Sequence, residues 1–248
     1  MFCEIFFRAT PGGNYLFAVG KRLLITGGST PVEELKQIVA GYSEVTALLT
    51  HEHGHYAATL SAFCRECGIP LHVPAACRGI LARRGMLPKE TISFDPAPFS
   101  VAGLELRPFP VYHDSAFCCG FFLTGVDGGI GMVANGKFLA DQFVAEWRCC
   151  STIIVKCEYE EEQLASEFSG GERLLQRKLA VTCGARYLQE YLPALLGEQF
   201  RRMIVTGAEP RFFPDAPLRY FMKGNELRWD VQERDTPGEW FPLGRASL

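Results

Sequence analysis

Short apolar runs separated by turn-forming residues open the chain. The runs cover residues 2–8, 14–19 and 22–26, and the segments between them contain glycine, proline and asparagine. Apolar runs of this length with such boundaries are typical of β-strands joined by tight turns. The pattern therefore predicts a meander of three strands.

The spacing of apolar positions then changes to one that favours helices. Over 31–41 they recur at helical spacing, and Thr30 and Glu33 have the positions of an N-cap residue and its capping-box glutamate. Residues 88–100 contain several prolines and predict an irregular excursion. Between these segments the pattern predicts a buried strand at 45–49, a helix at 56–67, a strand at 70–73 and a short helix at 75–84.

Strands and helices also alternate in the second half, so the fold class is α/β with mixed sheets. The predicted elements are strands at 104–109, 117–124 and 130–134, a helix at 137–147, a strand at 152–157, helices at 160–180 and 184–196, a strand at 203–206, and a hairpin of 218–223 with 226–231. We expect a single domain over 1–248 in which 211–248 is a C-terminal hairpin extension.

The composition supports a folded core and excludes disorder. Of the 248 residues 48% are hydrophobic and 21% are charged, and the net charge is −3. That charge gives no chain-wide attraction for nucleic acid or anionic membranes. The densest basic stretch contains Arg78, Arg83, Arg84 and Lys89. It is either an exposed helical face or a local contact for a phosphate backbone.

The beginning of the chain and the cysteines indicate an intracellular protein. The N-terminus has no basic leader, and no apolar stretch approaches the roughly 18–20 residues that span a bilayer. We expect a cytoplasmic protein without a membrane partner, whose ten cysteines are mostly reduced. Cys64 and Cys67 have metal-ligand spacing, but no second pair completes a zinc site, so packing is the better interpretation. A redox role is disfavoured because the pair lies near a predicted helix C-terminus, where the dipole opposes a thiolate.

Three of the five histidines fall in one pentapeptide, as His51, His53 and His55. In an extended segment these alternate positions project to one side. The segment follows a buried strand, and a catalytic zinc usually has three protein ligands with water in the fourth position. The alternative is a solvated turn whose rings pair with carboxylates such as Glu52.

The context of this pentapeptide resembles a known family. Residues 50–56 (THEHGHY) resemble the T-H-x-H-x-D-H loop of the metallo-β-lactamase superfamily, and 10–14 (TPGGN), 24–28 (LITGG) and 109–114 (FPVYHD) are similar to segments of its small bacterial exonuclease, phosphodiesterase and ribonuclease Z-like branch. The resemblance covers roughly residues 1–210. It implies a four-layer αββα sandwich with two mixed β-sheets and a site at one edge.

The resemblance implies one complete metal site and one degenerate site. His51, His53 and His113 stand where the family has the three histidines of its first metal. The positions of the second metal's ligands carry other residues: His55 for the loop aspartate, Tyr56 for the loop histidine, Asn135 for the bridging aspartate, Thr26 for the strand aspartate, and Ala185 and Gly207 near the later histidines. We therefore expect one zinc ion, or another divalent metal, rather than a dinuclear centre.

A three-histidine zinc site can still act alone, because zinc lowers the pKa of bound water to about 7. His55 then acts as a base, or it becomes a fourth ligand and makes the site structural. Asp114 either orients a metal histidine or caps the end of a strand. The acidic run at 158–162 predicts the beginning of a helix, where negative charge suits the dipole.

Two functions follow from this pattern. The first is a metal-dependent hydrolase, with one metal, acting on a phosphodiester or other phosphate-containing substrate. Nucleic acid and a small phosphodiester are both compatible with it. The second is a catalytically inactive protein of the same fold, kept as a binding or assembly module, which the lost ligands favour. A homo-oligomer is compatible with either function.

Overall fold

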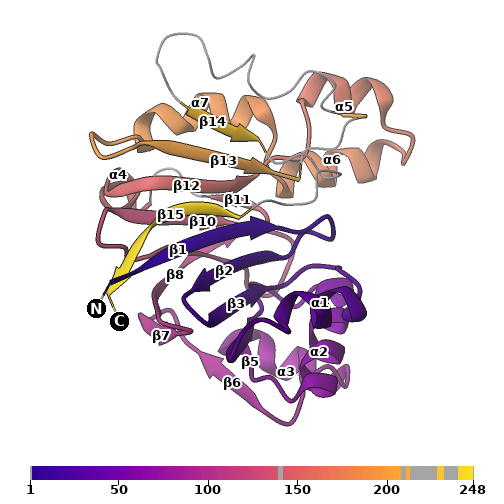
Figure 1. Ribbon diagram of the computed structural model, residues 1–248. Coiled ribbons are helices and arrows are strands. Elements are labelled where there is room, and N and C mark those ends of the chain that lie inside the picture. The colour runs from indigo at the N-terminus through magenta and orange to yellow at the C-terminus, as the bar shows by residue number, and fades with distance from the viewer. Residues whose placement is uncertain (1, 139–141, 208–210, 213–227, 232–239, 248) are drawn as a thin grey trace.

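Two β-sheets pack face to face in the computed structural model, which describes residues 2–138, 142–207, 211–212, 228–231 and 240–247 (Figure 1). In this part of the chain the first sheet has seven strands, in the order β15 (Phe241–Ser247), β1 (Phe2–Ala9), β2 (Tyr15–Val19), β3 (Arg22–Thr26), β4 (Glu44–Leu48), β5 (Leu71–Pro74) and β6 (Thr91–Phe94). The second has eight, in the order β11 (Lys137–Phe138), β8 (Leu104–Tyr112), β9 (Cys119–Leu123), β10 (Gly129–Val133), β12 (Cys150–Lys156), β13 (Arg202–Thr206) and β14 (Arg228–Val231), with β7 (Phe99–Val101) beside β8.

Both sheets are mixed. In the first, β15, β1, β2 and β3 pair antiparallel, whereas β3 to β6 pair parallel. In the second, β8, β9 and β10 pair antiparallel, whereas β10, β12, β13 and β14 pair parallel. The predicted opening meander is therefore confirmed as β1–β2–β3.

Helices form the two outer layers. The first sheet is covered by α1 (Val32–Val39), α2 (Gly54–Cys67) and α3 (Ala75–Arg83), and the second sheet by α4 (Val144–Arg148) and α7 (Ala185–Leu195). The remaining helices, α5 (Glu161–Glu167) and α6 (Glu172–Val181), follow β12 at one end of the second sheet (Figure 1). The four-layer αββα sandwich is confirmed.

The strands supply side chains to two separate cores. In β2, Phe17 and Val19 pack between the two sheets, whereas Leu16 and Ala18 pack under the helices. Successive side chains on a strand point to opposite faces, and both faces of this strand are covered. That is why β2 is buried along its whole length and reads as an uninterrupted apolar run.

The ends of several strands lie together at one edge of the sandwich. Because β8, β10, β12 and β13 run in the same direction, their C-terminal ends lie at the same edge of the second sheet. The loop after β4 reaches this edge from the first sheet, and the carbonyl of Thr50 accepts a hydrogen bond from the backbone N–H of Cys119 (3.1 Å). The edge is where chemistry from both sheets can meet.

Three predicted elements differ from the structure. The helix expected at 160–180 is two helices, α5 and α6, separated by residues 168–171. The helix expected at 137–147 is wrong in its first part, because Lys137–Phe138 pairs with β8 and α4 begins only at Val144. A short apolar segment fits either period, and pairing with a neighbouring strand decides between them. The excursion at 88–100 contains two strands, β6 and β7, each of which pairs at one side of its sheet.

The expected capping box of α1 is also wrong. The hydroxyl of Thr30 bonds instead to the hydroxyl of Thr10 (2.6 Å), and its backbone N–H donates to Asn14 Oδ1 (3.1 Å). Helix α1 therefore begins after Pro31 without a side-chain cap. The tertiary partner competes successfully for the hydroxyl that local sequence assigned to the helix.

The predicted C-terminal hairpin extension lies partly outside the described residues. Residues 218–223, its first arm, are among those not described. Of the described segments, β14 continues the second sheet beside β13, and β15 continues the first sheet beside β1.

Helices long and apolar enough to cross a bilayer are absent from the described part of the chain.

Close packing at Gly131 yields a stability prediction. A Cβ added there would lie 2.3 Å from the ring of the buried Trp147. We expect Gly131→Ala to lower the free energy of unfolding by about 1–3 kcal/mol, because the ring must move within a filled core. Urea denaturation measures this. Gly41→Ala is the matched control, since a Cβ there meets nothing within 4 Å, and equal effects of the two substitutions would contradict the prediction.

Candidate metal centre

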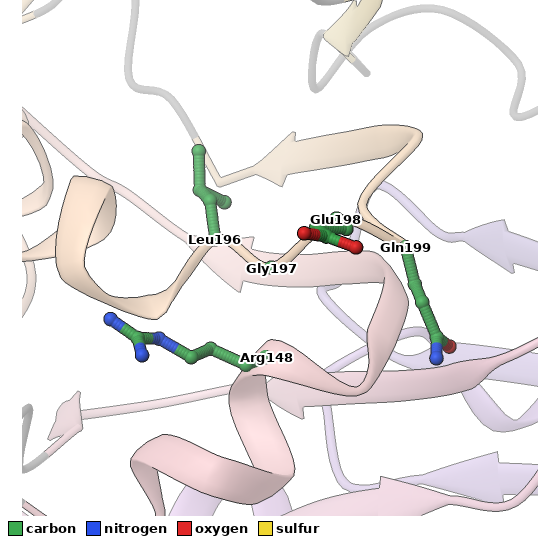
Figure 2. A pocket seen from close by; sticks show the side chains of 5 residues that line it. All are labelled: Arg148, Leu196, Gly197, Glu198 and Gln199. Carbon is green, nitrogen blue, oxygen red and sulfur yellow. The ribbon is translucent and has the colours of Figure 1, made fainter.

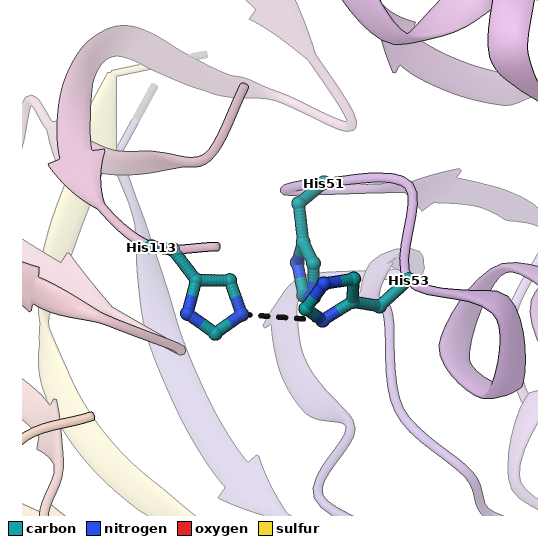
Figure 3. A group of neighbouring side chains, drawn as sticks. All are labelled: His51, His53 and His113. Atoms are coloured by element: carbon teal, nitrogen blue, oxygen red, sulfur yellow. Dashed lines mark hydrogen bonds between the residues drawn. The ribbon is translucent and has the colours of Figure 1, made fainter. Parts of the chain in front are cut away.

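Three imidazole rings meet at the edge of the sandwich (Figure 3). His51 and His53 lie on the loop after β4, and His113 follows the end of β8. One ligand atom from each residue lies within 4.8 Å of those of the others, and His113 Nε2 is 3.2 Å from His53 Nδ1. The structure thus brings together the three histidines that the sequence analysis selected, from two different sheets.

The rings of His51 and His113 are held in states suited to ligation. Burial lowers the pKa of His51 to about 2, so its ring is neutral at pH 7. Its Nδ1 lies 2.9 Å from the hydroxyl of Thr50. On the other side, His113 Nδ1 lies 3.1 Å from the carbonyl of Val181, which can only accept, so this nitrogen carries the proton and Nε2 keeps its lone pair.

An unpaired buried atom tests whether a metal fits. His51 Nε2 is buried without a hydrogen-bond partner. An unsatisfied buried polar atom costs about 1–3 kcal/mol, so it is retained where a ligand satisfies it. Neutral imidazoles converging on one point are a donor set that divalent transition metals favour. His51, His53 and His113 therefore fit a single divalent metal.

The carboxylate of Asp114 lies beside two of these rings. Its Oδ1 is 3.5 Å from His53 Nε2 and from His113 Nε2, and its Oδ2 accepts a hydrogen bond from Arg177 Nε on α6 (2.5 Å). Burial raises the pKa of Asp114, but the hydrogen bond from Arg177 and the neighbouring positive charges outweigh burial and lower it. An ionised carboxylate next to the ring nitrogens favours their ligating orientation. The role of Asp114 remains a prediction.

His55 lies apart from the three converging rings. It lies in the first turn of α2, where its ring packs on Tyr56 with the ring centroids 4.0 Å apart. It is exposed and does not belong to the group of potential ligand atoms. Its role as a base or as a fourth ligand stays a prediction.

A carboxylate that sequence reasoning missed joins the two loops of the site. Glu52 is buried, its Oε1 accepts a hydrogen bond from the backbone N–H of Ala116 (2.7 Å), and its Oε2 accepts one from Cys77 Sγ (3.2 Å). Ala116 lies three residues after His113, so Glu52 holds the loop of His113 against the loop of His51 and His53. The chain offers no local signal for this role, because both donors come from distant segments.

A surface pocket at the far end of the second sheet carries none of this chemistry. Figure 2 shows it beyond the end of α4, with a volume of about 380 Å³ and a lining of Arg148, Leu196, Gly197, Glu198 and Gln199. Arg148 precedes β12, whereas the strand ends that border the histidines lie at the other end of the sheet. The triad and not this pocket is the candidate site.

The sequence matches no protein-family model and no curated protein. Solved structures match it in shape at low identity. The metallo-β-lactamase fold protein YhfI from Bacillus subtilis has a TM-score of 0.67 and 13% identity, over 96% of this chain and 99% of its own. A diphosphatase from the PhnP family has a TM-score of 0.65 and 12% identity, over 98% and 100%. Zn²⁺-bound PqqB from Methylobacterium extorquens has a TM-score of 0.62 and 17% identity, over 95% and 86%.

The chain has the metallo-β-lactamase fold. Identities this low establish a shared architecture and leave the chemistry to be argued from the residues of the site.

In this metallo-β-lactamase fold, the positions that resemble the family's second metal ligands hold residues with other contacts. Thr26 Oγ1 accepts a hydrogen bond from the backbone N–H of Tyr15 (2.9 Å), and Asn135 Oδ1 accepts one from Lys156 Nζ (3.4 Å). Ala185 is buried in the first turn of α7, and Gly207 has no side chain to offer. Among the described residues, the histidine triad is the one group of three or more potential ligands.

A partly buried ion-pair network, also missed from sequence, borders the histidine triad. Lys156 Nζ contacts the carboxylate of Glu158, and Lys178 Nζ lies 3.2 Å from its other oxygen. Glu158 was expected to belong to a helix start, but α5 begins only at Glu161. Burial raises the pKa of Glu158, but the charges of Lys156 and Lys178 outweigh burial and lower it to about 2.

The role of Asp114 can be tested through metal affinity. We expect Asp114→Asn to weaken zinc binding by about 10–100-fold, because the ligating rings lose a carboxylate partner. Competition with a chromogenic zinc chelator measures the dissociation constant. Asp95→Asn, at an exposed aspartate, is the matched control. Unchanged affinity in Asp114→Asn would assign Asp114 to capping the strand.

The Glu158 network predicts loss of stability in acid. The lowered pKa contributes about 3 kcal/mol above pH 4.5, and this contribution disappears as the pH falls from about 4.5 to 2. We expect Glu158→Gln to cost about 3 kcal/mol at pH 7, because two partly buried ammonium groups lose their shared carboxylate, and to flatten the pH dependence in this window. Urea denaturation at several pH values measures both effects. Glu162→Gln removes an exposed pair with Arg186 and should change little.

Proposed function

We propose that this protein is a metal-dependent hydrolase that uses one zinc ion held by His51, His53 and His113. The observation that carries the proposal is the convergence of three imidazoles around a buried, unpaired His51 Nε2. Zn²⁺-bound PqqB, a protein of the same fold, supports the choice of zinc. When bound, a divalent metal at this position supplies a Lewis acid and makes hydroxide available near neutral pH.

The surrounding residues hold the three rings in place. Val181 and Thr50 fix ring nitrogens of His113 and His51, and Glu52 keeps the two loops together. Asp114, anchored by Arg177, orients the rings of His53 and His113. Since these supports come from several segments far apart in the chain, the site is preorganised by the fold.

His55 is our candidate for proton transfer. Its pKa is lowered, first by partial burial and then by the charges of His53 and Lys156, so its ring is neutral at pH 7 and can accept a proton. His55 is exposed and follows His53 by two residues in the chain, so a substrate can reach its ring.

We propose a phosphodiester or other phosphate-containing compound as the substrate. The diphosphatase of the same fold supports this class. A small phosphodiester and a nucleic acid are both included, and a cytoplasmic location and a homo-oligomeric state are further expectations.

A second candidate is an inactive protein that keeps the fold as a binding or assembly module. The observation that favours it is the replacement of the second metal's ligands by Thr26, Tyr56, Asn135, Ala185 and Gly207. This candidate predicts metal binding without turnover, or the absence of both metal binding and turnover.

Elemental analysis of protein purified without chelator tests the metal. We expect about one zinc per chain, and much less in a His51→Ala/His53→Ala double variant, because two of three ligands are removed. His72→Gln alters a histidine outside the triad, in β5, and should keep the metal. Metal well below one per chain in all three proteins would reject a resident metal.

Turnover separates the two candidate functions. We expect hydrolysis of a chromogenic phosphodiester by the zinc-loaded protein and none by the double variant. Full zinc occupancy without hydrolysis of phosphodiesters, with zinc or with other divalent metals added, would leave the binding module as the function.

A further inference from the structure

The charged side chain of Lys156 lies at the edge of the sandwich where the strand ends meet. It is the last residue of β12, and its side chain is 17% exposed. The Nζ atom contacts Glu158 and lies 3.4 Å from Asn135 Oδ1. The ammonium group therefore points to the end of β10 rather than to solvent.

The space for this side chain exists because residue 207 is glycine. A Cβ at Gly207 would lie 2.7 Å from Lys156 Cγ and 2.8 Å from Lys156 Cε. Gly207 also has a φ of 72°, which few other residues adopt. The stem of Lys156 thus fills the volume in which a side chain at 207 would project, a position that resembles a metal histidine in the family.

Asn135 and Gly136 connect the ammonium group to the histidines. Asn135 contacts Lys156 Nζ, and the next residue packs on the triad, since a Cβ added at Gly136 would lie 3.2 Å from His113 Cβ. The charge of Lys156 is also felt by the rings, because it contributes to the lowered pKa values of His51 and His113, behind the larger effect of burial. Lys156 and the triad therefore belong to one site.

The ammonium group of Lys156 keeps its positive charge in this network. Lys156 and Lys178 both contact the carboxylate of Glu158. Burial lowers the pKa of Lys156, but the charge of Glu158 outweighs burial and raises it, so the ammonium group is protonated at neutral pH. An ammonium group has three donors, and Glu158 and Asn135 account for two of them.

We propose that Lys156 is a fixed anion-binding group that takes the place of a second cation in this site and holds an anionic oxygen of the substrate's phosphate group. The proposal rests on the proposed function, whose substrate it specifies further: the phosphate group must present two anionic or polar oxygens, one toward the triad and one toward Lys156. It also means that a second divalent ion is repelled by a like charge and meets only a neutral amide at Asn135.

Calorimetric titration with inorganic phosphate tests the proposal on the full chain, with one equivalent of zinc and separately in chelator. We expect Lys156→Gln to weaken phosphate binding to the zinc-loaded protein by at least about tenfold, the loss expected for one charged hydrogen bond. We expect its zinc affinity to be unchanged or higher, because a neighbouring positive charge has been removed. Lys89→Gln, at an exposed lysine, should leave phosphate binding within about twofold.

Lys156→Met is a second variant that guards against misfolding, because it keeps the apolar stem of the side chain and leaves Glu158 paired with Lys178. It should show the same loss of phosphate binding. Phosphate binding that is unchanged in either variant while zinc still binds would overturn the proposal and leave the hydrolase intact. So would a wild-type protein that does not bind phosphate with or without zinc. If zinc is not bound but the phosphate affinity in chelator depends on Lys156, the metal proposal fails and the anion-binding role stands.

Discussion

Contacts between the two sheets hold the site together. The backbone N–H of Cys119 bonds to the carbonyl of Thr50, and the backbone N–H of Ala116 bonds to the carboxylate of Glu52. The first joins the loop after β4 to the start of β9, and the second joins it to the segment between β8 and β9. Because His51 and His113 stand on opposite sides of this junction, their convergence depends on the packing of one sheet on the other, and the apolar core between the sheets maintains that packing.

Electrostatics then gives the edge two different halves. On one side burial lowers the pKa values of His51 and His113, and one buried nitrogen of His51 is unpaired. On the other side Lys156 and Lys178 both contact Glu158 in a partly buried network. A divalent metal suits the first half and an anion suits the second, and a phosphate group spanning both would be held by complementary charges. A fold shared with proteins of several activities thus carries a site with its own charge pattern.

Much of the fold could be predicted because its strands and helices obey local rules. Strands β1, β2 and β3 form the expected meander. Helix α2 ends at Gly68, whose φ of 65° is the usual left-handed end of a helix. The failures share one cause, which is a tertiary partner. Thr30 bonds to Thr10 instead of capping α1, and Lys137 pairs with β8 instead of starting a helix.

The sequence pattern by itself predicted the alternation of strands and helices and drew attention to His51 and His53, because periodicity and spacing are local properties. The layer order and the choice of His113 came from the resemblance to the family. Only the tertiary structure showed that His113 joins them, that His55 lies apart, and that Glu52 links the two loops. It alone revealed the network of Lys156 with Glu158. Lys156 at the end of β12 and Gly207 after β13 have no detectable relation in sequence. Only because β12 and β13 lie side by side does the missing side chain of Gly207 leave the space that Lys156 fills.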